Sequence, residues 1–185
     1  MDIVSLMESF RESYGGRLVG GRPQKLEGKN VSEVVMGALK GHPTWMGEIR
    51  GRPASIEVVD GDMVSVSFVC RMEGFLSLKP RRLGGIMGLY ARIFRGAQFP
   101  EDPEFDRFFT ITTNDREMMR RVLGDVALRE RLLNLDGVYH VELSSGTLQI
   151  LRTSESIRFS GMSALWTTAE TALVLAERIE RAAGQ

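Results

Sequence analysis

Hydrophobic and polar residues recur along this chain with two different periods, and these periods separate predicted strands from predicted helices. Phe109 and Ile111 alternate with threonines, a period of two that predicts a half-buried strand. Asn114 and Glu117 then have the three-residue spacing of a helix capping box. Apolar residues three or four apart follow, so we expect central helices within residues 114–135.

The same two periods organise the remainder of the chain into a single α+β domain covering residues 1–185. A helical N-terminal extension is expected in residues 1–42, followed by antiparallel strands within 45–112, where the period is two. A hairpin is expected at 138–152 and a long C-terminal helix at 163–183, with small alanines in its apolar stripe. We therefore expect an antiparallel sheet of about five to seven strands with helices packed on it.

Residues 79–99 form a basic and apolar segment that stands out from the other strands and helices. No acidic residue lies between Glu73 and Glu101, and five basic residues give the segment a local charge of +5. Its basic flanks beside one apolar face of a helix at about 84–95 are typical of a segment that contacts a protein partner or an anionic membrane. The simpler interpretation, a core helix with solvated arginines, stays open. The candidate contact residues are Lys79, Arg81, Arg82, Ile86, Leu89, Tyr90, Arg92, Ile93, Phe94 and Arg95.

Composition narrows the classes of partner and the compartment. Basic and acidic residues number 24 each, so the net charge is zero and no global field attracts nucleic acid. One cysteine excludes an internal disulfide and fits a reducing compartment. The sequence shows no signal peptide and no apolar run long enough to cross a bilayer. We expect a cytoplasmic protein, peripheral to the membrane if the basic segment binds lipid.

The residue types that carry chemistry are few and scattered. Cys70 lies on the apolar side of its predicted strand, which favours an inert buried thiol. His42 and His140 lie far apart without metal-ligand spacing, although His140 shares the polar face of its strand with Glu142. Ser67 lies on a polar strand face without a glycine elbow. We therefore expect no metal, no cofactor and no catalytic residue.

Two further segments have structural explanations. Residues 17–29 are rich in glycine and predict a loop, but they lack the lysine and hydroxyl spacing of a phosphate-binding P-loop. A group of carboxylates flanked by prolines predicts a solvated loop ahead of a strand; its members are Glu101, Asp102, Glu104 and Asp106.

These patterns favour a non-catalytic interaction or adaptor domain that binds a protein partner, a second copy of itself or an anionic membrane through residues 79–99. The alternative is an enzyme or small-ligand protein whose polar groups converge only in three dimensions. The first hypothesis is based on the apolar periodicity, which accounts for a complete core. The second stays open because periodicity does not show which polar groups meet in the folded chain.

The central stretch also resembles a known family. Over about residues 45–155 the chain is similar to an uncharacterised bacterial family. The shared features are the sequence runs at 102–108 and 129–135, an aspartate at 115 before a helix, and the hairpin that follows. Many of its members are soluble domains tethered behind membrane helices. The resemblance implies an α+β domain and supplies no catalytic residue.

Overall fold

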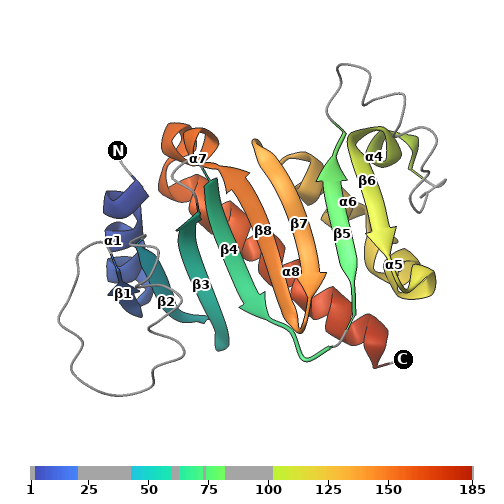
Figure 1. The fold of residues 1–185 in the computed structure, drawn as a ribbon, viewed down its shortest axis with the longest axis horizontal. Coiled ribbons are helices and arrows are strands. Elements are labelled where there is room, and N and C mark those ends of the chain that lie inside the picture. The colour runs from blue at the N-terminus through green and yellow to red at the C-terminus, as the bar shows by residue number, and fades with distance from the viewer. Residues whose placement is uncertain (1–2, 21–42, 60–62, 73, 82–101, 185) are drawn as a thin grey trace.

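The computed structural model describes residues 3–20, 43–59, 63–72, 74–81 and 102–184, and within them one antiparallel sheet has eight strands (Figure 1). The strand order is β1-β2-β3-β4-β8-β7-β5-β6. The strands are β1 (Arg17–Val19), β2 (Thr44–Ile49), β3 (Arg52–Val59), β4 (Met63–Val69), β5 (Leu76–Pro80), β6 (Phe109–Thr113), β7 (Val138–Ser144) and β8 (Thr147–Thr153). The predicted α+β class and antiparallel sheet are confirmed, whereas the predicted five to seven strands are too few. The unpredicted strand is β1, which forms inside the expected loop.

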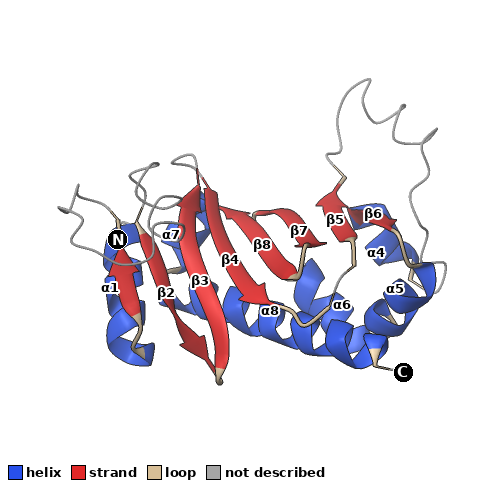
Figure 2. Cartoon of the chain, turned by 60° about the horizontal axis from the view of Figure 1, so that its bottom comes forward, coloured by secondary structure: helices blue, strands red, loops and turns tan. Residues whose placement is uncertain are grey.

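Six helices occur in the described ranges, and they lie on one side of the sheet (Figure 2). They are α1 (Ile3–Tyr14), α4 (Pro103–Phe108), α5 (Arg116–Leu123), α6 (Val126–Leu133), α7 (Ser154–Ser160) and α8 (Met162–Ala183). The long C-terminal helix is therefore confirmed. Among the described residues, no helix has the length and apolar character needed to cross a bilayer.

Helix α8 is the main support of the sheet. It crosses behind β4 and β8 in Figure 1, and it contacts both strands as well as α5, α6 and α7. Ala169, Ala172 and Ala176 are buried along its inner stripe, so the helix backbone can approach the strands closely. The strands supply alternate apolar residues to this layer, for example Val66 and Ile150, which are fully buried cross-strand partners. The helix side of the sheet is therefore the hydrophobic core.

Two local predictions for the central stretch were wrong. Asp115, one residue after the expected cap, accepts the capping hydrogen bond from Met118 N at 2.8 Å, while Asn114 Oδ1 accepts one from Phe75 N at 3.0 Å. The described carboxylates of the proline-flanked group do not form a solvated loop, because Asp102 caps α4, proline occupies the first turn of that helix, and Glu104 and Asp106 lie within it.

Two predicted helices cannot be compared with the structure. One is a second helix of the N-terminal extension, predicted from the capping spacing of Asn30 and Glu33, and the other is the basic helix at 84–95; both lie outside the described residues.

Candidate functional site on the open face of the sheet

The side of the sheet opposite the helices is covered by no described secondary-structure element (Figure 2). We call it the open face. Strand pairing aligns one residue from each of the eight strands in a single row across it. In strand order, the row is Arg17, Met46, Ser55, Ser67, Gln149, Glu142, Ser77 and Thr112. Seven strands thus contribute a polar residue and β2 a methionine.

Short polar side chains on the open face bond to one another. Gln149 Nε2 donates to Ser65 Oγ at 2.6 Å, and Ser65 Oγ lies 3.2 Å from Ser67 Oγ. Ser65 is buried among these neighbours although it points away from the helices. The Gln149 bond joins β8 to β4 and the serine pair lies along β4, so together they hold the middle of the face in one arrangement.

A serine, a histidine and a carboxylate meet where β5 pairs with β7. Ser77 Oγ lies 2.7 Å from His140 Nε2, and His140 Nδ1 lies 3.3 Å from Glu142 Oε2. Ser77 is 4% exposed, and the side chains of His140 and Glu142 are 16% and 32% exposed. Ser77 is the cross-strand partner of Glu142, so the sheet register itself brings the three residues together. We call them the Ser-His-Glu cluster.

The surroundings of the cluster keep its histidine neutral. Burial lowers the pKa of His140 below the ordinary value of 6.5, the Glu142 carboxylate opposes this shift, and the Lys79 ammonium adds to it. The carboxylate favours the tautomer with its proton on Nδ1, which leaves Nε2 to accept a hydrogen bond from the Ser77 hydroxyl. Chemically, this arrangement is a hydroxyl beside an oriented neutral base.

Of the ten candidate contact residues, the structure describes only Lys79 and Arg81. Lys79 is exposed near the end of β5, and the Arg81 backbone N–H donates to Phe108 O at 2.7 Å. Arg81 Nε donates to Phe109 O at 3.2 Å, so this arginine is fixed along β6 and is not a free contact group. The other candidate contact residues lie outside the described residues; they are Arg82, Ile86, Leu89, Tyr90, Arg92, Ile93, Phe94 and Arg95.

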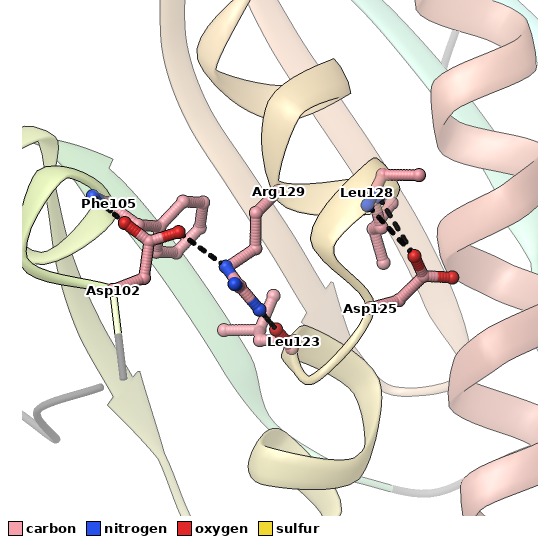
Figure 3. A network of polar contacts seen from close by, with 7 residues as sticks. Asp102, Phe105, Leu123, Asp125, Leu128 and Arg129 are labelled. Atoms are coloured by element: carbon pink, nitrogen blue, oxygen red, sulfur yellow. Dashed lines mark hydrogen bonds and ion pairs between the residues drawn. The ribbon is translucent and has the colours of Figure 1, made fainter. Parts of the chain in front are cut away.

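The chain re-enters the described structure at a buried ion pair (Figure 3). Asp102 Oδ1 accepts from Phe105 N at 3.0 Å, and Asp102 Oδ2 accepts from Arg129 Nε at 2.6 Å. The Phe105 hydrogen bond, and after it the Arg129 guanidinium, lower the pKa of the Asp102 carboxyl. Arg129 also donates to Leu123 O at 2.5 Å. Arg81 and Asp102 thus hold the described chain in place immediately before and immediately after residues 82–101.

An open depression of about 940 Å³ lies between the end of β4, the start of β5 and the β7–β8 turn. Its lining residues are Cys70, Arg71, Met72, Gly74, Phe75, Asn114, Ser145 and Gly146. Cys70 is buried, as predicted from its place in the strand, and this burial raises the pKa of its thiol to about 11. Glu180 fixes the rim, because it accepts two hydrogen bonds from Arg52, at 2.9 and 2.7 Å, and one from Arg71 N at 2.8 Å.

Sequence reasoning found part of the Ser-His-Glu cluster and missed the rest. It placed His140 beside Glu142 on the polar face of a strand, as observed. It weighed Ser67 as a nucleophile and overlooked Ser77, whose position between Leu76 and Leu78 was the available signal for a polar-face residue. In the part of the chain that the structure describes, no three His, Cys, Asp or Glu residues are grouped as a metal site would require.

Comparison with known proteins supports the fold. No family model matches the chain, and no curated protein matches it. Among solved structures, the crystal structure of the mycobacterial trehalose monomycolate transport factor A, TtfA, is similar with a TM-score of 0.61 and 11% sequence identity. The similarity covers 95% of this chain and 93% of that one, so the two proteins share the arrangement of the sheet and its helices over nearly their whole lengths.

Proposed function

We propose that this protein is an interaction domain in a transport-associated process, and that it binds its partner with the open face and the basic segment beside it. The observation that carries the proposal is the one-sided covering of the sheet (Figure 2). Helices bury one face, and the other presents a row of residues across eight strands that is polar on all but β2. At the usual strand spacing such a row is about 34 Å long. That width suits a macromolecular partner better than an enclosed small molecule.

The anchored ends of residues 79–99 add a positive charge to this surface. Lys79 is exposed on the open face, and Arg81 and Asp102 are both held by hydrogen bonds at the β6 side of the sheet. The sequence between them contains three further arginines and no acidic residue before Glu101. We propose that this segment contacts an anionic surface, of which a membrane leaflet is the simplest example.

The transport association comes from the structural comparison. TtfA is named as a trehalose monomycolate transport factor, and its fold covers almost all of this chain. The central stretch resembles an uncharacterised bacterial family whose members are often tethered to a membrane, and this resemblance supports a role for the protein at a membrane surface. The transport association and the membrane location are both proposals for this chain.

Vesicle co-sedimentation tests the proposed anionic contact. Arg82, Arg92 and Arg95 are changed together to glutamate; Arg81 is left intact because it bonds to Phe109 O. We expect the wild type to bind phosphatidylserine vesicles in a salt-sensitive way and to ignore phosphatidylcholine vesicles. At about 1 kcal/mol per basic residue, the triple variant should bind at least ~100-fold more weakly.

The control carries the same charge change elsewhere. Arg116, Arg120 and Arg131 are exposed on α5 and α6, and their triple glutamate variant should sediment like the wild type. Equal binding by the wild type and the Arg82, Arg92 and Arg95 variant, or an equal loss in the control, would contradict a contact through the basic segment.

A further inference from the structure

We propose that the Ser-His-Glu cluster is a hydrolytic site in which Ser77 is the nucleophile for a carboxylic ester, His140 is the general base and Glu142 orients the base. This activity goes beyond the binding role and differs from the expectation that the domain has no catalytic residue. The proposal rests on the contacts among Ser77, His140 and Glu142, on the charge of Lys79, and on the depression at the start of β5.

The contacts match the spatial requirements of a serine nucleophile. A hydroxyl becomes nucleophilic when a base accepts its proton and a third group fixes that base. Here the oxygen–nitrogen distance between Ser77 and His140 is 2.7 Å, and the distance from the other ring nitrogen to Glu142 is 3.3 Å. All three residues lie on paired strands, which hold them more rigidly than loops would.

The electrostatics of the cluster suit a base that works at neutral pH. His140 is neutral there because burial lowers its pKa, so Nε2 is free to take a proton. Lys79 lies two residues after Ser77 on the same face of β5, and its charge acts on His140. A cation in that position can stabilise the negative oxygen that develops when an ester carbonyl is attacked.

The nearby depression indicates the class of ester. Phe75 lines the depression and precedes Ser77 by two residues, about 7 Å along an extended chain. Met72 and Cys70 add further apolar surface to the depression. An ester with an apolar acyl chain could place that chain in the depression, its carbonyl at Ser77 and its alcohol on the polar open face.

The reaction uses water as its co-reactant and balances in two steps. Ser77 Oγ bonds to the carbonyl carbon while its proton passes to His140 Nε2; the ester C–O bond then breaks and the alcohol leaves with that proton. In the second step water gives a proton to His140 Nε2 and its oxygen bonds to the same carbon. The bond to Ser77 Oγ then breaks, the serine oxygen recovers the proton, and the acid is released.

Two measurements on the full chain test the proposal: labelling by an alkyl fluorophosphonate, with the modified residue mapped by mass spectrometry, and hydrolysis of p-nitrophenyl esters of increasing acyl length. We expect a label on Ser77 and faster hydrolysis of medium-chain esters than of acetate. Ser77→Ala and His140→Gln should each reduce hydrolysis at least ~100-fold, as loss of a nucleophile or a general base does.

The matched control is Ser13→Ala, which removes an exposed hydroxyl of α1, a helix that lies on the other side of the sheet from the open face. It should label and hydrolyse like the wild type, and thermal unfolding identifies any variant that fails to fold. Absence of label on Ser77 in the folded wild type, or equal hydrolysis by Ser77→Ala, would overturn the proposal. Vesicle binding is read separately, so either proposal can fail alone.

Glu142 is a positioning residue, and a pH profile distinguishes this role from a merely structural one. The carboxylate raises the pKa of His140 against the effect of burial. Glu142→Gln should therefore move the acid limb of the rate to lower pH while reducing the plateau. An unchanged acid limb would remove Glu142 from the proposed relay.

Discussion

Replacing Trp45 with alanine should lower the free energy of unfolding by about 4 kcal/mol, the cost of removing a fully buried aromatic side chain. Trp45 packs edge-to-face against Phe10, with ring centroids 5.0 Å apart, and its Nε1–H donates to Gly15 O at 2.9 Å. Glycines make room for the indole: a Cβ on Gly47 would lie 2.6 Å from its Cζ2. Trp45 thereby joins α1 to the β1–β2 edge of the sheet.

Chemical denaturation followed by circular dichroism measures this loss, and Trp166 provides the control. Trp166 is half-buried and stacks on Tyr14 with ring centroids 4.6 Å apart. Trp166→Ala should cost about 2 kcal/mol, because it removes two aromatic pairs, with Tyr14 and Phe10, from a side chain that is only half-buried. Similar losses for the two variants would contradict the assignment of Trp45 to the core.

Replacing Arg129 with alanine should lower the free energy of unfolding by about 3 kcal/mol, the usual consequence of removing one partner from a buried ion pair. Arg129 is 6% exposed and holds both Asp102 and the Leu123 carbonyl (Figure 3). Its loss leaves the Asp102 carboxylate and the Leu123 carbonyl without this donor. Because Asp102 follows the basic segment directly, the variant should also weaken vesicle binding.

Arg131 on the same helix is the control for this second prediction. It is exposed, so Arg131→Ala should change the free energy of unfolding by no more than about 0.5 kcal/mol. Urea titrations of both variants at one pH give the comparison. If Arg129→Ala were as stable as Arg131→Ala, the buried ion pair would not anchor α4 to α6.

The α+β class could be predicted because its signal is local. Alternation in Phe109 and Ile111 indicated a strand, and the alanine stripe indicated the long helix that became α8. Strand β1 gave no such signal, because three residues between glycines are too short to show a period. Its partner residues in β2 determine its conformation, and these lie far away in the sequence.

The Ser-His-Glu cluster could be predicted only in part for the same reason. His140 and Glu142 lie on one strand, so alternation placed them together. Ser77 reaches them because β5 pairs with β7, and these strands are separated in sequence by α4, β6, α5 and α6. Strand order depends on how the helices pack beneath the sheet, which periodicity does not encode. The Asp102–Arg129 ion pair was not predicted for the same reason: it joins two helices, α4 and α6, whose packing periodicity does not show.

Site-specific photo-cross-linking tests the central claim that the protein binds through the open face. A photoreactive phenylalanine analogue replaces Ser67 or Thr147 on that face, or the exposed Thr167 of α8 on the helix side, in cells that naturally make the protein. The account predicts a discrete cross-linked product from Ser67 and Thr147 and none from Thr167. A product from Thr167 alone would show that the helix side is the binding surface, and would contradict the account.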